Sequence, residues 1–338
     1  MRQVFITKAG APEVLKVQES PDPEAGAGQV RVRVKASGIN FADLMARQGL
    51  YPGMPKIPCV IGYEASGLID QVGAGVTKLK VGDRVLAMPK FGGYSDTLVV
   101  PDTQAFLMPA AMTFEEAAAL PVNYLTAHHA MLQIHNLQRG SKILLHSAAG
   151  GVGVAAIQLA KLRDCVVFGT ASPGKHEFLR SLGVQHPIDS GGDIEAAVRA
   201  VIGKDGGLDM VLDPLGGPSW TMGYRLLGPA GHLVCFGFSG AASGKTLSWL
   251  HVIGQFLRIK RYSPLQLMND NKTVSGVNMA AYFDRIELVT PEFEALIAMY
   301  ERGEIKPHVD KTFSFADAPA AHHYLHERKA KGKVLLVP

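Results

Sequence analysis

The hydrophobic pattern of this 338-residue chain changes along its length. Through the first 120 residues or so, short runs of alternating apolar and polar residues are separated by Gly and Pro, as at residues 30–36 and 83–88. Alternation with a period of two is the pattern of a strand with one exposed face. This part of the chain is therefore predicted to form a small β-barrel-like domain.

Between about residues 140 and 240 the pattern predicts strands that alternate with helices. Just before this region, Thr113 and Glu116 form a capping box that begins a helix. The predicted strands are apolar runs at residues 142–146, 165–169, 209–213 and 232–236, and predicted helices occupy 154–162 and 175–182. Such alternation specifies a parallel sheet with helices on both faces, the doubly wound α/β class. Residues 333–337 are predicted to form a strand that returns to the first domain.

Composition narrows the classes of protein that fit. Hydrophobic residues make up 47% of the chain and charged residues 19%, enough for the cores of two domains. The formal charge of +4 is too small and too evenly spread for a nucleic-acid-binding surface. Because the cysteines (Cys59, Cys165 and Cys235) form no CxxC pair, we expect reduced, buried thiols in a cytoplasmic protein. No apolar run reaches the roughly 20 residues that cross a bilayer.

A glycine-rich run lies where a predicted strand gives way to a helix, which is the context of a dinucleotide-binding fingerprint. The run comprises Ala148, Ala149, Gly150, Gly151, Val152 and Gly153. We expect Gly150 to let the backbone approach a pyrophosphate, and Gly153 to let the helix pack closely on the strand. The helix N-terminus would bind the phosphates. Ala148 occupies the position of the first glycine, so the fingerprint is incomplete and a plain glycine-rich connection is the alternative.

The end of the second predicted strand favours NADPH over NADH. An NAD site places an acidic residue there, where it binds the ribose 2′-hydroxyl. Here the strand ends in a run that includes Thr170 and Ser172. Lys175 comes next, and no acidic residue precedes Glu177. Hydroxyl groups and a lysine would bind the 2′-phosphate that an acid would repel. The alternative is that Ser172 caps a helix and Lys175 is a solvated surface residue.

These motifs resemble those of the zinc-free quinone oxidoreductase branch of the medium-chain dehydrogenase/reductases. The cofactor loop at residues 147–153 and the signature at residues 38–51 match that branch in residue type and spacing. Further similar segments, at residues 62–67, 81–85 and 332–336, extend the match over nearly the whole chain. Within the branch, residues 42–51, 113–120 and 305–308 are especially similar to the vesicle amine transport protein homologues.

The resemblance implies a GroES-like catalytic domain built from both ends of the chain, with a Rossmann domain between them. The expected boundaries are residues 1–122 for the first part of the catalytic domain, 123–264 for the NADPH-binding Rossmann domain, and 265–338 for the part that completes the catalytic domain. An active site in the cleft between the domains is also implied, as is a homodimer joined at the edge of the Rossmann sheet.

The positions that hold zinc in related alcohol dehydrogenases carry other residues here. Those enzymes place a Cys and a His where this chain looks to have Asn40 and Tyr63, and no Cys or His stands near Val122, where the third ligand is expected. The adjacent histidines at 128–129 and 322–323 diverge on a helix and do not face one ion. We therefore expect no metal. Without zinc to stabilise an alkoxide, acceptors that delocalise the incoming charge are favoured.

Three residues, Asn40, Asp43 and Tyr51, match family positions that line the nicotinamide cleft. We expect Tyr51 to donate to the substrate oxygen, Asn40 to make polar contacts near the ring, and Asp43 to orient the loop. The alternative is that Asn40 and Asp43 are turn residues and Tyr51 is an exposed aromatic. Further cofactor contacts are implied at Thr126, Ser190, Phe236, Gly237, Phe238, Asn271 and Arg328. At Ser190 many relatives carry a tyrosine.

The function expected from these features is zinc-independent, NADPH-dependent hydride transfer to a small-molecule quinone or α,β-unsaturated carbonyl. The alternative is a catalytically weak lipid- or partner-binding protein that keeps the reductase fold and the NADPH site. Residues 247–261 have an apolar stripe and a basic end, which would suit a membrane surface. Such a helix more often covers its own core or a dimer interface, so we expect no membrane contact.

Overall fold

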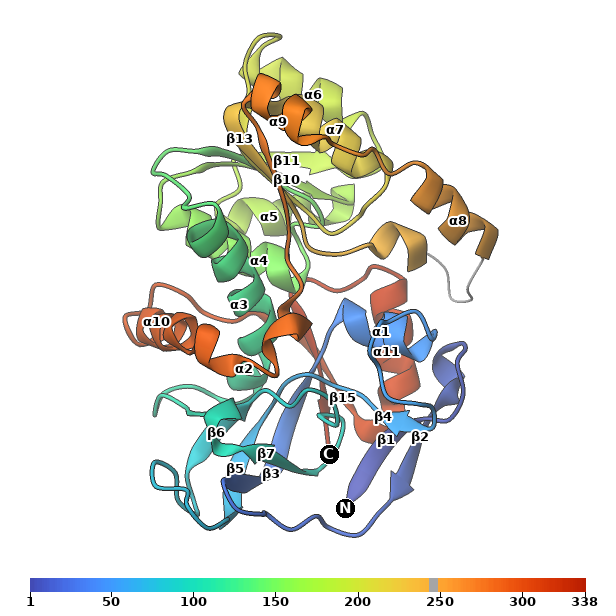
Figure 1. The fold of residues 1–338 in the computed structure, drawn as a ribbon, viewed down its shortest axis with the longest axis vertical. Coiled ribbons are helices and arrows are strands. Elements are labelled where there is room, and N and C mark those ends of the chain that lie inside the picture. The colour runs from blue at the N-terminus through green and yellow to red at the C-terminus, as the bar shows by residue number, and fades with distance from the viewer. Residues whose placement is uncertain (243–248) are drawn as a thin grey trace. The chain divides into compact units, whose positions relative to one another are not determined.

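The computed structural model describes residues 1–242 and 249–338 and divides the chain into two compact units. Unit 1 comprises Met1–Leu125 and Met279–Pro338, and unit 2 comprises the described residues between them. Both ends of the chain lie in unit 1 (Figure 1). One unit holds a parallel sheet and the other a mainly antiparallel one, so the expected α/β fold class is confirmed. Within the described residues, no helix is long and apolar enough to cross a membrane.

Two sheets form the framework of unit 1 in the part of the chain that the structure describes. The larger has the order β15–β16–β3–β5–β6–β8, with β7 also paired to β3, and the smaller has the order β2–β1–β4. The strands of the larger sheet are β3 (Gln29–Ile39), β5 (Ala65–Val72), β6 (Arg84–Ala87), β7 (Thr97–Pro101), β8 (Ala105–Leu107), β15 (Val309–Ser314) and β16 (Lys333–Val337). Those of the smaller are β1 (Arg2–Ile6), β2 (Leu15–Glu19) and β4 (Cys59–Val60). The predicted return strand is β16, which pairs antiparallel with β3.

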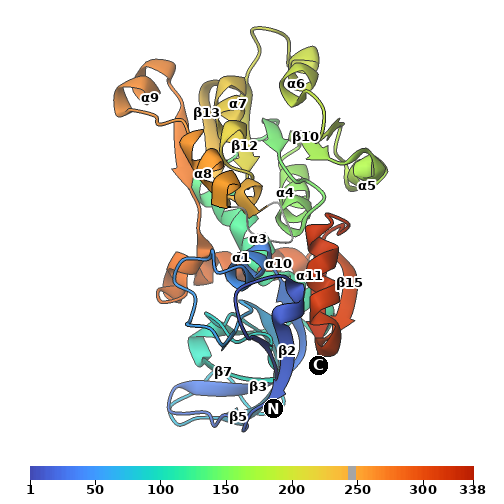
Figure 2. The same cartoon turned by 90° about the vertical axis from the view of Figure 1, so that its right-hand side faces the viewer.

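The long strand β3 shows why the alternating pattern forms this sheet. Val30, Val32 and Val34 are buried, and the arginines between them lie on the other face. The apolar face packs into a core shared with β5 and β7, which lie beside β3 in Figure 2. Burial of one face and solvation of the other follow directly from the two-residue period.

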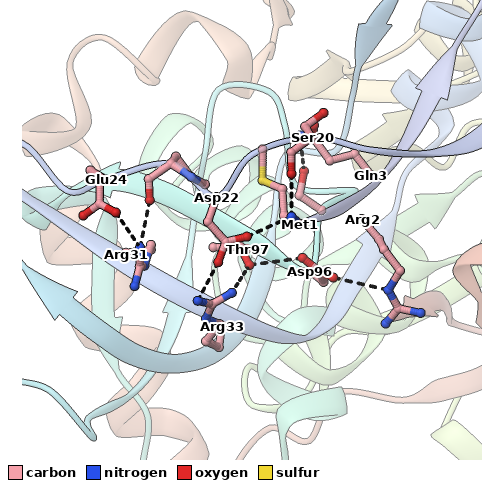
Figure 3. A network of polar contacts seen from close by, with 12 residues as sticks. Met1, Arg2, Gln3, Ser20, Asp22, Glu24, Arg31, Arg33, Asp96 and Thr97 are labelled. Carbon is pink, nitrogen blue, oxygen red and sulfur yellow. Dashed lines mark hydrogen bonds and ion pairs between the residues drawn. The ribbon is translucent and has the colours of Figure 1, made fainter.

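On the other face of β3, ion pairs attach the first residues of the chain (Figure 3). The Met1 ammonium group lies 2.8 Å from an Asp22 carboxylate oxygen, and the second oxygen of Asp22 lies 2.6 Å from the Arg33 guanidinium. Arg33 also donates to the Thr97 hydroxyl at 2.7 Å. Since these groups are partly exposed, each pair contributes only about 0–1 kcal/mol to stability.

Helices complete unit 1. They are α1 (Phe41–Arg47), α2 (Phe114–Ala119), α10 (Thr290–Glu301) and α11 (Ala318–His326), and α3 (Pro121–His128) crosses the boundary between the units. The predicted capping box begins α2, where the Thr113 hydroxyl accepts from the Glu116 amide at 3.1 Å and the Glu116 carboxylate accepts from the Thr113 amide. A second capping box, made by Asn40 and Asp43, begins α1.

Unit 2 is a parallel sheet in the order β11–β10–β9–β12–β13–β14. Its strands are β9 (Lys142–Leu145), β10 (Val166–Ala171), β11 (His186–Asp189), β12 (Leu208–Asp213), β13 (Leu227–Cys235) and β14 (Thr273–Gly276). Its helices are α4 (Gly151–Lys161), α5 (His176–Leu182), α6 (Ile194–Ile202), α7 (Pro218–Leu226), α8 (Trp249–Leu257) and α9 (Pro264–Asp270). The predicted strand–helix alternation is confirmed.

The strand order reverses direction beside β9. Strands β10 and β11 extend the sheet to one side of β9, and β12, β13 and β14 extend it to the other. Helix α4 contacts α5, and α6 contacts α7. Because crossovers between parallel strands are right-handed, these two pairs of helices cover opposite faces of the sheet. Ligands of doubly wound sheets bind at the carboxyl ends of the strands, next to such a reversal.

The second domain boundary differs from the expected one. Residues 265–278 were expected in the catalytic domain, but they form most of α9 and all of β14 in unit 2. The reason is strand pairing: β14 is parallel to β13, with Leu233 opposite Val274. The hydrophobic pattern after residue 265 is mixed, and it did not predict that a further strand, β14, joins this sheet. The first boundary, expected after residue 122, lies after Leu125 within α3.

Candidate functional site

The glycine-rich run forms a tight turn from β9 into α4, as the fingerprint predicts. Ser147 has a φ of +53°, and Gly150 stands at the N-cap of α4 in an extended conformation with no side-chain cap. The amides of Gly151, Val152 and Gly153 fall in the first turn of the helix, where intrahelical acceptors are lacking. An uncapped helix N-terminus that follows a strand at the carboxyl edge of the sheet is suited to hold an anion.

Packing explains two of the small residues around this turn. A Cβ placed on Gly153 would collide with the backbone carbonyl of Ala148, so the close approach of helix to strand requires glycine, as predicted. Ala148 itself is buried, and a Cβ on Gly169 of β10 would lie only 3.1 Å from its methyl group. Gly169 therefore makes room for the alanine that replaces the usual first glycine of the fingerprint.

The end of β10 carries no carboxylate beside the turn. Ser172 is exposed and begins a short turn that contains Lys175, which is half-buried. Ser190 follows β11, and its amide donates to the Ala171 carbonyl at 2.9 Å, which places it at the same edge. The side chain of Thr170 is buried and accepts a hydrogen bond from the Ser147 amide at 3.2 Å. This hydrogen bond helps to fix the glycine-rich turn from inside the fold.

The carboxyl end of β13 meets that of β12. The Phe236 amide donates to the Asp213 carbonyl at 3.1 Å, and a Cβ on Gly237 would lie 3.0 Å from the Pro214 carbonyl oxygen. The Phe238 ring covers Gly216, which leaves no room there for a side chain. The segment from Phe236 to Phe238 thus lies at the carboxyl edge, where it was expected.

The structure places Asn271, an expected cofactor contact, away from the glycine-rich turn. It ends α9 and precedes β14, and its carbonyl accepts from the Ala230 amide at 2.6 Å. This is the amino edge of the sheet, opposite the glycine-rich turn, because β13 and β14 both run from here toward the carboxyl edge. Two other expected contacts stay predictions. Thr126 is buried in α3, and Arg328 follows α11 in unit 1 with a φ of +54°.

In unit 1, Asn40 belongs to a buried polar cluster with Glu64 and Lys333. The Lys333 ammonium group donates to Asn40 Oδ1 at 2.6 Å and to Glu64 Oε1. Asn40 Nδ2 donates to the same Glu64 oxygen at 2.7 Å, and the Val122 amide donates to the other at 2.8 Å. Buried charges are tolerated when they are paired in this way. One hydrogen on Asn40 Nδ2 is left for a further acceptor.

Asp43 is fully buried at the start of α1. One carboxylate oxygen accepts from the Asn40 amide at 2.7 Å, and the other has no hydrogen-bond partner. Burial raises the pKa of Asp43 to about 7, against the opposing effects of the Asn40 amide and the Lys333 charge. The bond from the Asn40 amide ties Asp43 to the turn that precedes α1, and the orienting role of Asp43 stays a prediction.

Tyr51 lies in an aromatic cluster with Tyr63, Phe91 and Phe283. The centroids of the Tyr51 and Tyr63 rings are 5.6 Å apart, and Tyr63 also contacts Phe91 at 5.4 Å and Phe283 at 6.0 Å. Burial raises the pKa of both phenols, and the Asp43 charge adds to the effect. Tyr51 therefore keeps its proton at neutral pH. Tyr51 is half-buried and also packs against the hydrophobic core of unit 1.

The donor set at the expected zinc positions is not that of a metal site. Asn40 is engaged by Lys333 and Glu64, Tyr63 is a phenol among aromatic rings, and Val122 presents its backbone amide to Glu64. Among the described residues, no group of three or more His, Cys, Asp or Glu side chains lies close enough to hold an ion. A lysine ammonium group next to Glu64 disfavours a cation there.

Several residues around these positions were not identified from the sequence as part of a site. Glu64 and Lys333 complete the cluster around Asn40, and His146 and Asp213 lie buried at the ends of β9 and β12. A weak signal was present for each of them. Every one is a polar residue within or directly beside an apolar run, where an unpaired polar group is costly.

Two family models match the chain. The model described as alcohol dehydrogenase GroES-like domain matches residues 26–110, in unit 1, and the model described as zinc-binding dehydrogenase matches residues 182–336. The human synaptic vesicle membrane protein VAT-1 homolog is 41% identical over 342 residues, which span 100% of this chain and 86% of that protein. The quinone oxidoreductase of Pseudomonas aeruginosa is 34% identical and spans 100% of this chain and 99% of that protein.

Solved structures show the same fold over the whole chain. The Escherichia coli quinone oxidoreductase complexed with NADPH has a TM-score of 0.87 at 29% identity, covering 100% of both chains. The CurK enoyl reductase has a TM-score of 0.85 at 27% identity, covering 99% of this chain and 98% of that one. The chain therefore belongs to the family of medium-chain dehydrogenase/reductases that contains the VAT-1 homologues and the quinone oxidoreductases.

Proposed function

We propose that this chain is an NADPH-dependent reductase that transfers hydride to a quinone or an α,β-unsaturated carbonyl without a metal. The observation that carries the proposal is the turn into α4: an uncapped helix N-terminus at the carboxyl edge of a doubly wound sheet, packed so closely that Gly153 admits no side chain. Relatives named quinone oxidoreductase and enoyl reductase, one of them solved with NADPH, support the reaction class.

The residues of unit 2 fit the parts of NADPH. The first-turn amides of α4, from Gly151 to Gly153, would hold the pyrophosphate. Ser172 and Lys175 would bind the 2′-phosphate, and Ser190 lies at the same edge. The segment from Phe236 to Phe238 would line the nicotinamide end. When bound, NADPH supplies the hydride.

The residues of unit 1 would serve the acceptor. The protonated phenol of Tyr51 would donate to the substrate oxygen as negative charge develops on it. Asn40 would offer its remaining N–H, because its other amide groups are held by Lys333 and Glu64. Quinones and enones delocalise the new charge themselves, so a few well-placed hydrogen bonds suffice where a simple ketone would need a Lewis acid.

Steady-state oxidation of NADPH with a panel of acceptors tests this function. We expect turnover with quinones and conjugated enones, and poor turnover with saturated alkanones of matched size. Efficient reduction of a simple alkanone would contradict the chemical argument. Binding of NADPH with no turnover of any acceptor would favour the second candidate function.

That second candidate is a lipid- or partner-binding protein that keeps the reductase fold. The observation that favours it is the end of α8, where Ile253, Phe256 and Leu257 are exposed, with Arg258 directly after them. The apolar segment suggested by the sequence begins at residues 247 and 248, which lie outside the described residues. Exposed apolar residues beside a cation suit a membrane surface, and they equally suit a dimer interface. Co-sedimentation with anionic vesicles distinguishes a membrane-binding face from a dimer interface. A dimer that covers these residues would not sediment with the vesicles.

A further inference from the structure

A buried acid and a buried histidine lie at the ends of neighbouring strands beside the cofactor turn, and the proposed reaction does not use them. Asp213 ends β12 and is fully buried, and His146 follows β9 and is 2% exposed. The nearest oxygen of Asp213 is 3.8 Å from His146 Nε2. Strands β9 and β12 pair directly at the point where the strand order reverses. Burying an acid and a histidine costs free energy unless both have hydrogen-bond partners, so their partners indicate what the two residues do.

The carboxylate of Asp213 holds the turn that leads into α7. One oxygen accepts from the Leu215 amide at 2.6 Å and from the Gly216 amide at 3.4 Å. The other accepts from the hydroxyl of Ser219, in the first turn of α7. This turn is glycine-rich, with φ values of +87° at Gly216 and +59° at Gly217, so it has little rigidity of its own. Asp213 supplies the bonds that define its shape.

On its other side His146 reaches the cofactor turn through Thr170. His146 Nδ1 lies 3.3 Å from the Thr170 hydroxyl, and the same hydroxyl accepts from the Ser147 amide at 3.2 Å. Ser147 has a φ of +53°, a conformation that a residue with a side chain adopts only when its surroundings impose it. The bond from its amide to Thr170 is one such constraint.

The directions of these bonds follow from one fixed donor, the Ser219 hydroxyl, which donates its proton to Asp213. Burial lowers the pKa of His146, with a smaller opposing effect from Asp213, so the ring is neutral and has one donor and one acceptor nitrogen. With its proton given to Asp213, the Ser219 oxygen can only accept from His146 Nε2, 3.5 Å away, so Nε2 carries the hydrogen. Nδ1 is then the acceptor nitrogen, and it lies 3.3 Å from the Thr170 hydroxyl, whose proton it receives.

We propose that Thr170, His146, Ser219 and Asp213 form a directional hydrogen-bond chain that positions the cofactor turn and the turn before α7 relative to each other. They are positioning residues, and their function rests on the proposed binding of NADPH. The chain begins at the Ser147 amide, passes through Thr170, His146 and Ser219, and ends on the Asp213 carboxylate, which also holds the Leu215 amide. Cofactor binding and hydride transfer require loops whose positions are fixed to within about 1 Å.

Substitution of Thr170 tests the first link. Thr170→Val keeps the shape and removes the hydroxyl, so we expect the dissociation constant for NADPH to rise about tenfold. Thr170→Ser restores the hydroxyl and should bring the value back to within about twofold of the wild type. A matched control is Thr97→Val in unit 1, a threonine as deeply buried, whose hydroxyl accepts from Arg33. It should lower the melting temperature and leave NADPH affinity unchanged.

Substitution of Asp213 tests the far end of the chain. Asp213→Asn turns an acceptor into a donor that faces His146 and Ser219, and we expect NADPH affinity to fall by about tenfold or more. The control is Asp209→Asn at the other end of β12, where the carboxylate accepts from the Lys142 amide at 2.7 Å at the amino edge of the sheet. In the double variant Thr170→Val/Asp213→Asn, the loss should be smaller than the product of the two single losses.

The tautomer of His146 can be measured by NMR spectroscopy in the wild-type protein, without a substitution that could impair folding. The ¹⁵N shifts of His146 in the wild-type protein should report a neutral ring with hydrogen on Nε2, both without and with NADPH. Hydrogen on Nδ1, or a charged ring at neutral pH, would overturn the chain as drawn. So would unchanged NADPH affinity in folded Thr170→Val and Asp213→Asn proteins. A wild-type protein that binds no NADPH would instead overturn the proposed function, while the tautomer would still be tested.

Discussion

Lys333 and Glu64 form an ion pair with both side chains nearly excluded from solvent, and Asn40 bonds to both partners. Lys333 begins the last strand of unit 1, and Glu64 directly precedes β5. Through Asn40, the pair thus connects the last strand to the start of α1. Removing one partner leaves the other charged and buried, which is more costly than removing both.

The first prediction is that Lys333→Met lowers the free energy of unfolding by about 3–5 kcal/mol, the usual cost of an uncompensated buried charge. Denaturant unfolding measures it. The double variant Lys333→Met/Glu64→Gln should recover a large part of that loss, because no charge remains buried. Equal losses in the single and double variants would show that the ion pair is not the relevant interaction.

A second prediction concerns the pH dependence of stability at Asp43. Its pKa is about 7 in the folded chain, whereas an unfolded aspartate releases its proton near pH 4. Folding therefore takes up a proton between these values, and the contribution of Asp43 to stability falls as the pH rises from about 4 to about 7. Relative to Asp43→Asn, the wild type should lose about 2–4 kcal/mol across this window. A constant difference between the two proteins would place the pKa of Asp43 near its ordinary value.

Cofactor preference is the third prediction. NADPH should bind more tightly than NADH by about 1–3 kcal/mol, the contribution of charge-assisted hydrogen bonds from Ser172 and Lys175. Lys175→Ala should weaken NADPH and leave NADH nearly unchanged by calorimetry. Lys204→Ala, an exposed lysine after the end of α6, is the matched control. Equal affinities of the wild type for both cofactors would exclude a dedicated 2′-phosphate site.

The fourth prediction is that Tyr51→Phe slows reduction of an enone by roughly ten- to a thousandfold while NADPH affinity is preserved. The substitution keeps the ring in its aromatic cluster and deletes one donor. A quinone should be affected less, since its product anion is better delocalised. Tyr324→Phe removes a phenol that donates to Asp310 at 2.9 Å and should leave both rates unchanged. If both rates are also unchanged in Tyr51→Phe, Tyr51 has no part in the mechanism.

The fifth prediction is independence from zinc. Metal analysis of the purified protein should find no stoichiometric zinc, and chelators should leave activity intact, because Asn40, Tyr63 and the Val122 amide do not offer the ligands that zinc prefers. A tightly bound equivalent of zinc would overturn the assignment of the catalytic residues.

The cofactor turn was predictable because its determinants are local. The strand into Leu145, the small residues from Ala148 to Gly153 and the amphipathic helix after them lie within about twenty residues, and each acts through backbone geometry and periodicity. Gly153 shows this well, since the collision that forbids a side chain there is with a residue only five positions away. The capping box at Thr113 is local in the same sense.

Other features depended on which strands pair, and the local sequence pattern does not predict that pairing. Asn271 was expected at the cofactor because it lies in a region that reaches the cofactor in relatives, yet the direction of β14 places it at the opposite edge. Thr170 was expected among the cofactor contacts, and the structure adds that its hydroxyl accepts from Ser147, 23 residues away, inside the fold. A residue's position along a strand does not say which face or edge it will occupy.

By itself, the sequence determined the two-part architecture, the parallel sheet and the glycine-rich turn, because hydrophobic period and glycine placement act over a few residues. Only the tertiary structure decided that Lys333 neutralises Glu64 across 269 positions of sequence, and that His146 and Asp213 meet beside the cofactor turn. Buried polar groups find partners wherever the fold brings strands together, and no local pattern encodes that meeting.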